Sequence, residues 1–197
     1  MNPTMAIRLT IYLILLIAPA INAQNPPTPA ADFAFEQWKE YISKEGAFRV
    51  LMPGVPTELS QPIEDKPGSA VAYVVSLTTK TAEYSVTFTS FGRDLETMQP
   101  SKVTLDGLRD RMLLKESGKL VSEEDVLLDG HPGRSVVIEV VDGIFRDRWF
   151  LVKDRLYGIS IFTPTANAAT AANLEGIRKA QDSIGKQFLE SFKLVTQ

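Results

Sequence analysis

Cysteine is absent from the 197-residue sequence. Without thiols the chain can form no disulfide bond, no thiolate metal site and no thiol nucleophile, and it has no lipobox cysteine for a lipid anchor. Histidine occurs once, as His131, which is therefore the only imidazole for acid–base or metal chemistry near neutral pH. A metal site at His131 would need further ligands of other types.

An excess of basic charge is also absent, since 21 Lys and Arg stand against 24 Asp and Glu, giving a net charge of −3. Proteins that bind nucleic acid present clustered basic charge, so we expect no nucleic-acid partner. The sequence contains no G-x-S-x-G nucleophile motif and no D-x-D-x-D-G calcium loop. We therefore expect no cofactor, no metal and no catalytic residues, and we predict that the protein is not an enzyme.

Long hydrophobic runs are missing except at the N-terminus. There Arg8 is followed by the apolar run Leu9 to Ala18, by Pro19 and by the small-residue exit Ile21 to Ala23. This layout is typical of a secretory signal, and we predict a signal peptide over residues 1–23. Export without cysteine favours the bacterial periplasm or the exterior over a disulfide-bonded secreted domain.

The alternative is an uncleaved membrane anchor. A spanning helix needs about 20 mostly apolar residues, whereas the stretch from Leu9 to Ala23 has 15 and contains Pro19 and Asn22. We expect no transmembrane segment in the mature chain. Residues 24–32 are rich in proline and predict a flexible lead, and residues 33–197 predict a single domain.

Alternating hydrophobicity predicts strands in the first half of this domain. Phe48 to Met52 is a short apolar run that the turn at Pro53 to Pro56 ends. Val71 to Thr79 and Tyr84 to Phe91 alternate and are joined by a hairpin-sized link. We expect an antiparallel pair with one apolar face and one face rich in hydroxyl groups.

Helical spacing follows from Pro100 to Ser117, where Leu105, Leu108 and Met112 form one apolar stripe. Gly118 predicts a left-handed end to this helix. A second helical pattern covers about Thr170 to Lys193, with a break near Gly185 as the alternative.

Between the two predicted helices lie four apolar runs that are separated by residues typical of tight turns. They are Leu120 to Leu128, Ser135 to Val141, Ile144 to Val152 and Leu156 to Thr163. This spacing predicts a four-stranded meander. The fold class is then α+β, with a mostly antiparallel sheet made of the hairpin and the meander and covered by an internal helix and a C-terminal helix.

Five segments together resemble exported bacterial domains of uncharacterised function. They are WKEYISKEGAFRVLMPGVPTE at 38–58, LDGLRD at 105–110, GKLVSEEDVLLDGHPGR at 118–134, RWFLVKDRLYGISIF at 148–162 and FLESFKL at 188–194. Their layout is similar to the PsbP fold of the extrinsic photosystem II subunit, which also occurs in a small Ran-GTPase-binding protein. The resemblance implies a small accessory module that docks on a larger assembly. No functional residue of PsbP matches position by position.

Two groups of residues are candidate binding surfaces. Arg146 and Arg148 share one face of a strand, and with Arg134 they are candidates for gripping an anion or a partner's carboxylate. The alternative is a solvated sheet face with cross-strand ion pairs, for example to Glu139.

Aromatic residues crowd the start of the domain, where Phe33, Phe35 and Trp38 are candidates for a partner-binding patch. Alternatively, they hold the N-terminal segment on the sheet. Two acidic runs, Glu123 to Asp125 and Glu64–Asp65, are interpreted as solvated charge, and His131 as an ordinary turn residue.

These observations lead to one main functional hypothesis, an exported, non-catalytic binding or accessory module that docks on an unknown protein or envelope partner. The first alternative is a hydrolase-type enzyme that uses carboxylates in a helix–sheet cleft, which would show converging charged groups and a shifted carboxyl pKa. The second is a carrier of a small ligand or lipid, which would show a cavity of several hundred Å³.

Overall fold

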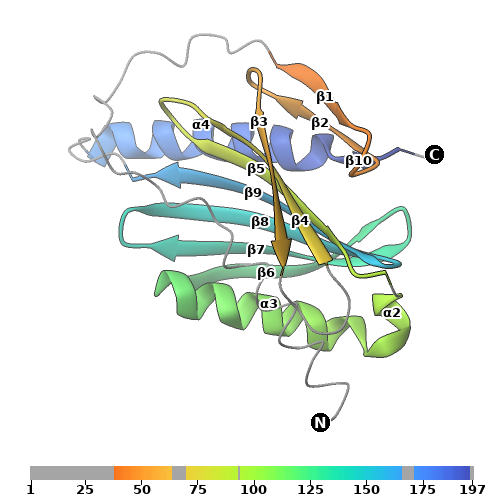
Figure 1. Ribbon diagram of the computed structural model, residues 1–197. Coiled ribbons are helices and arrows are strands. Elements are labelled where there is room, and N and C mark those ends of the chain that lie inside the picture. Colours follow the sequence, from red (N-terminus) through yellow and green to blue (C-terminus); the bar gives the residue numbers. More distant parts are fainter. Residues whose placement is uncertain (1–37, 64–69, 93, 166–170, 196–197) are drawn as a thin grey trace.

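Residues 38–63, 70–92, 94–165 and 171–195 are described by the structure, a computed structural model (Figure 1). In chain order they form β1 (Lys39–Ser43), β2 (Phe48–Met52), β3 (Thr57–Ile63), β4 (Ala70–Thr78), β5 (Glu83–Ser90), α2 (Leu95–Met98), α3 (Ser101–Glu116), β6 (Lys119–Leu128), β7 (His131–Val140), β8 (Gly143–Val152), β9 (Arg155–Pro164), α4 (Ala171–Ser191) and β10 (Lys193–Leu194).

The larger of two sheets has seven strands in the order β3-β4-β5-β9-β8-β7-β6, and every neighbouring pair is antiparallel. The predicted hairpin is β4–β5, and the predicted meander runs from β6 to β9. Pairing of β5 with β9, from Glu83 opposite Phe162 to Ser90 opposite Arg155, joins the two into one sheet. The predicted α+β class with a mostly antiparallel sheet is confirmed.

A smaller sheet, β1-β2-β10, covers part of one face of the larger sheet (Figure 1). Its last strand is only Lys193–Leu194, which pairs with Arg49 and Phe48 of β2. The predicted fold class did not include this second, smaller sheet. The proline-rich turn after β2 does end that strand, and the chain then enters the larger sheet as its edge strand β3.

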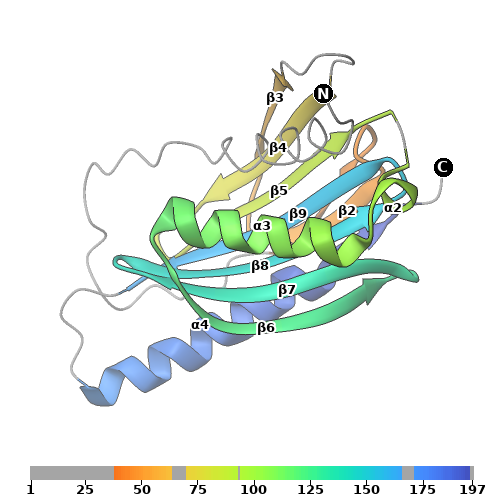
Figure 2. The same cartoon turned by 90° about the horizontal axis from the view of Figure 1, so that it is seen from below.

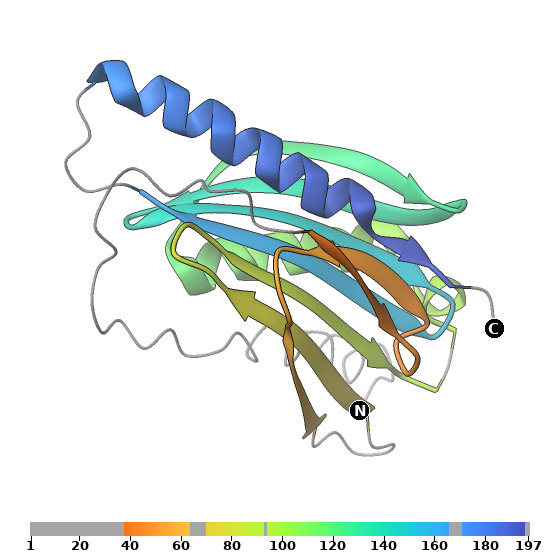
Figure 3. The same ribbon diagram turned by 90° about the horizontal axis from the view of Figure 1, so that it is seen from above.

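Both faces of the larger sheet are covered. The face that we call the α3 face carries α3 and α2 (Figure 2), and the opposite α4 face carries α4 and the smaller sheet (Figure 3). Each face has its own apolar core. On the hydroxyl-rich side of β5, Thr89 is fully buried on the α3 face, whereas Ser85 and Thr87 are partly exposed.

The first long helix confirms the predicted stripe, since Leu105, Leu108 and Met112 are all buried against the sheet. The residue that ends α3 differs from the prediction. Ser117, with φ of 49°, takes the left-handed conformation in place of Gly118. Gly118 serves close packing instead, because a Cβ at this position would overlap the side chain of Ile138.

The second long helix is continuous, so the predicted alternative of a break near Gly185 is wrong. Gly185 is buried and lets α4 approach β8, since a Cβ there would lie 3.2 Å from Cδ of Arg146. Among the described helices, none has both the length and the apolar character needed to cross a membrane.

The turn between β6 and β7 is shorter than predicted. Asp129 and Gly130 have φ of 51° and 87°, the two positive values of a type I′ turn. His131, expected in this turn, is instead the first residue of β7 and pairs with Leu128.

Phe48 is the centre of an aromatic cluster on the α4 face. Its ring centroid lies 5.3 Å from that of Phe192, 6.0 Å from Phe88 and 6.3 Å from Tyr157. The Tyr157 hydroxyl donates a buried hydrogen bond of 2.7 Å to the carbonyl of Gly46. The cluster therefore connects both sheets with the C-terminal end of α4.

We predict that Phe48→Ala lowers the free energy of unfolding by about 3–5 kcal/mol, because it removes a fully buried ring and leaves a cavity. Urea denaturation monitored by circular dichroism measures this loss. The control Ile42→Ala truncates a side chain on β1 that is 55% exposed, and we expect a change below about 1 kcal/mol. Equal losses in the two variants would contradict the central role of Phe48.

Candidate functional site

The three candidate arginines do not form one surface. Arg148 pairs with Ser135, whereas Arg134 pairs with Trp149, which belongs to the core of the α3 face. Arg146 and Arg148 therefore lie on the α4 face, and Arg134 lies on the α3 face. The structure brings the first two together and separates them from the third.

Arg134 is a buried cation at the centre of an ion-pair network whose carboxylates reach the surface. Its side chain is 3% exposed, and its guanidinium lies 3.0 Å from Oδ1 of Asp106 in α3 and 2.8 Å from Oδ1 of Asp125 in β6. It also pairs with Glu123, which accepts a second hydrogen bond, of 2.8 Å, from Arg109. The network links α3 to β6 and β7.

The sequence suggested that the run from Glu123 to Asp125 is solvated charge. In the structure two of its three carboxylates pair with Arg134 instead. Burial acts to raise the pKa of Asp106, but the hydrogen bond from Arg134 and the neighbouring cations outweigh it and hold that pKa below its usual value. The carboxylates of this network are already neutralised by arginine. The second acidic run, Glu64–Asp65, lies outside the described residues.

Arg146 and Arg148 lie beneath α4. Arg146 pairs with Asp182 of α4 and donates a hydrogen bond of 3.1 Å to the Thr163 hydroxyl. Arg148 donates a hydrogen bond of 3.4 Å to the carbonyl of Leu189, near the C-terminal end of α4. Among the described residues no ion pair involves Glu139, and Arg146 pairs with Asp182 instead.

The aromatic candidates are only partly described. Phe33 and Phe35 lie outside the described residues, as do the predicted signal peptide and proline-rich lead. Trp38 is half-buried and packs edge-on against Tyr84, with centroids 5.7 Å apart. Trp38 thus contacts the core of the α4 face.

Asp147 is a buried acid that the sequence did not single out. It lies on the α3 face of β8, is 2% exposed, and its Oδ1 has no hydrogen-bond partner among the described residues. Burial raises its pKa to about 7, although a hydrogen bond with Ser160 acts in the opposite direction. The sequence did contain a signal for this burial. Asp147 lies two residues from both Phe145 and Trp149, and in a strand this spacing places all three side chains on the same, apolar face.

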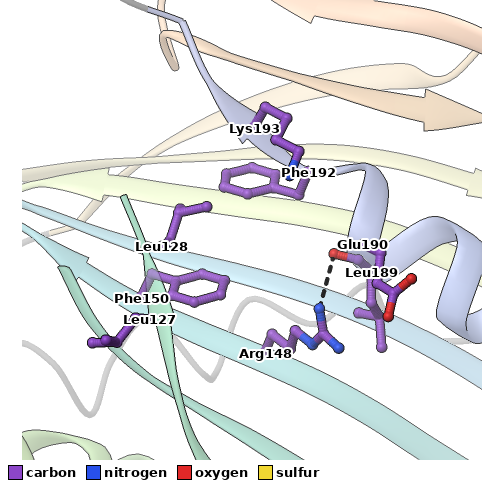
Figure 4. A pocket seen from close by; sticks show the side chains of 8 residues that line it. All are labelled: Leu127, Leu128, Arg148, Phe150, Leu189, Glu190, Phe192 and Lys193. Atoms are coloured by element: carbon purple, nitrogen blue, oxygen red, sulfur yellow. Dashed lines mark hydrogen bonds between the residues drawn. The ribbon is translucent and has the colours of Figure 1, made fainter. Parts of the chain in front are cut away.

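A surface groove opens on the α4 face, at the C-terminal end of α4 (Figure 4). We call it the α4 groove; its volume is about 390 Å³. The lining residues come from β6, β8, α4 and β10 and are Leu127, Leu128, Arg148, Phe150, Leu189, Glu190, Phe192 and Lys193. Arg148 is the only candidate from the sequence among them.

The floor of this groove is apolar and firmly packed. Leu128, Phe150, Leu189 and Phe192 are each at most 8% exposed. The Phe150 ring lies over Gly133, where a Cβ would overlap it, and stacks parallel to Phe192 with centroids 6.3 Å apart. We expected Gly133 to lie in a turn. In the structure it makes room for the Phe150 ring in the floor of the groove.

The rim of the groove is exposed and charged. Leu127 is 74% exposed, and both Glu190 and Lys193 are exposed. No cluster of three or more metal-ligating side chains occurs in the part of the chain that the structure describes. Chemically, the groove offers polar and charged groups together with a limited apolar surface to another molecule.

Comparison with known proteins finds solved structures with a similar fold. No protein-family model and no curated protein matches the chain. Among solved structures, it is similar to cyanobacterial PsbP from Synechocystis sp. PCC 6803, with 10% identity and a TM-score of 0.49 over 86% of this chain and 99% of that chain. It is also similar to a Pseudomonas aeruginosa protein of unknown function, with 14% identity and a TM-score of 0.35. That match covers 75% of this chain and 92% of the other chain.

The first of these likenesses is to the PsbP-like fold that the sequence predicted. Likenesses at such identities concern the arrangement of strands and helices. They carry nothing about the activity, partner or location of this protein.

We predict that Arg134→Met lowers the free energy of unfolding by about 3 kcal/mol, because it leaves clustered carboxylates without their central cation. Urea denaturation at constant salt measures the change. The control Arg49→Met breaks an exposed pair with Glu40 and should cost less than about 1 kcal/mol. If Arg134→Met leaves the free energy of unfolding unchanged, the network does not hold α3 on the sheet.

We predict that Asp147→Asn stabilises the protein relative to wild type, and more at pH 8 than at pH 5. In the unfolded chain the Asp147 carboxyl loses its proton near the ordinary aspartate pKa of 3.8, and in the folded protein near 7, so the wild type loses stability as pH rises through this window. The difference in free energy of unfolding between Asp147→Asn and wild type should grow by about 2–3 kcal/mol from pH 5 to pH 8. Urea denaturation at both pH values measures it, and a constant difference would contradict the prediction.

Proposed function

We propose that the protein is a non-catalytic binding module that docks a protein partner through the α4 groove. The observation that carries the proposal is an apolar floor that is built into the core and open to solvent at its rim. Binding energy at protein interfaces concentrates where a large side chain fills such a pocket and is shielded from water. The four floor residues offer a preformed site for one apolar side chain of a partner.

The position of the groove supports a protein partner. It lies beside β6, an edge strand of the larger sheet that pairs only with β7 among the described strands. Near the end of this strand Leu128 faces the groove, whereas the exposed side chain of Leu127 lies on the opposite, α3 face of the strand. A partner that inserts a side chain into the groove would therefore contact Leu128 at the end of β6.

The enzyme alternative has less support. Among the described residues, Asp147, Asp106 and Glu83 have shifted carboxyl pKa values, but none of them lines the groove. The carboxylates that converge on the α3 face are paired with Arg134. Within the groove the lining includes one carboxylate, that of Glu190, whereas the hydrolase hypothesis requires a cooperating pair.

The carrier alternative has one observation in its favour, because about 390 Å³ lies within the range of small-ligand pockets. Such pockets usually enclose most of the ligand surface, while this rim is exposed. Export to the periplasm or exterior stays a prediction from the N-terminal sequence, and the proposal places the partner in that compartment.

We predict that a photo-crosslinking amino acid at Glu190, which is exposed and lines the groove, captures a discrete protein partner in cells that naturally make the protein. The control position is Leu114, which is 81% exposed but lies on α3, on the opposite side of the sheet. Immunoblotting after irradiation should show an adduct with the first variant and none with the second. The proposal fails if both positions give the same adducts or if neither does. A small molecule retained in native mass spectrometry, without an adduct, would favour the carrier.

A further inference from the structure

Two cations flank the apolar floor of the α4 groove, in a protein that is acidic overall. Arg148 lies near the end of α4, and Lys193 extends from β10 near Phe192 (Figure 4). The only carboxylate among the groove's lining residues is Glu190. The groove therefore carries a local excess of positive charge, against a net charge of −3 for the whole chain.

Arg148 keeps unused hydrogen-bonding capacity. A guanidinium has five N–H donors, and among the described residues Arg148 uses one of them, in the 3.4 Å bond to the Leu189 carbonyl. Its Nε is buried and has no hydrogen-bond partner within the described part of the chain. An acceptor that reaches the groove would meet a guanidinium already held in place by β8 and α4.

Lys193 lines the groove beyond Phe192, at the strand position that pairs with Arg49. It is exposed and forms no ion pair with the described residues. Glu190 lies 3.9 Å from Lys186, outside the groove lining, so its charge is partly shared with another cation. The two groove cations are thus not neutralised within the groove.

We infer that the α4 groove recognises an acidic–apolar segment of a partner protein, in which a large apolar side chain is flanked by carboxylates. The apolar side chain contacts Phe150 and Phe192, and the carboxylates contact Arg148 and Lys193. This inference rests on the proposed docking function and adds the chemistry of the segment. A basic segment would meet like charge at both cations, which disfavours it.

The test uses amide chemical shifts of the nitrogen-15-labelled protein and three capped peptides. The probe is Glu-Leu-Phe-Glu; the controls are Lys-Leu-Phe-Lys, which reverses the charge, and Glu-Ser-Gly-Glu, which removes the apolar side chains. We expect saturable shifts at the groove residues for the probe, at millimolar peptide, and at least about tenfold weaker binding of both controls. Equal binding of all three peptides, or shifts away from the groove, would overturn the inference.

Variants then test the cations. Lys193→Glu should weaken binding of Glu-Leu-Phe-Glu by roughly fivefold or more, and Arg148→Gln should also weaken it. The matched control Lys102→Glu makes the same charge change at an exposed site on α3 and should leave the dissociation constant unchanged. Equal weakening by Lys193→Glu and Lys102→Glu would mean that only net charge matters, which contradicts a site in the groove.

Two further outcomes separate this inference from the proposed function. If the Glu190 adduct forms and survives Lys193→Glu, while the acidic peptide does not bind, the docking function stands and the acidic–apolar chemistry is wrong. If decanoate shifts the groove amides and the acidic peptide does not, the occupant is a fatty acid and the inference is overturned.

Discussion

The packing of aromatic rings around Phe48 is the contact on which the rest of the α4 face depends. Phe48 belongs to the smaller sheet, Phe88 and Tyr157 belong to the larger sheet, and Phe192 follows α4. Because Phe192 also stacks on Phe150, the floor of the α4 groove is a continuation of this cluster. The groove floor is therefore preformed by the packing of the core, which reduces the entropy lost when a partner is bound.

The two faces of the larger sheet have different chemistry. The α3 face contains buried charged groups, with Arg134 linking α3 to β6 and Asp147 enclosed in the apolar core. The α4 face is aromatic and opens to solvent at the end of the helix. Buried charges require fixed partners, so the α3 face is suited to holding the scaffold, while the open apolar floor is suited to contacts with another molecule.

Local patterns in the sequence predicted most of the elements, because alternation with period two and spacing of 3.6 are properties of a few adjacent residues. They predicted the hairpin, the meander and both long helices. They did not predict β1, β3 or β10. The last of these is two residues long and exists only because Phe48, far away in the chain, offers backbone hydrogen bonds to it.

The candidate site shows the same division. That Arg146 and Arg148 share a face follows from alternation within one strand. The opposite placement of Arg134 depends on the register between β7 and β8, which the residues of the intervening turn set. Composition and spacing alone determined the fold class, the lack of thiol chemistry and the near-neutral charge. Only the tertiary structure decided that Leu127, Phe150 and Lys193 line one groove, because residues from separate strands and a helix end become neighbours only when the whole sheet has closed around its core.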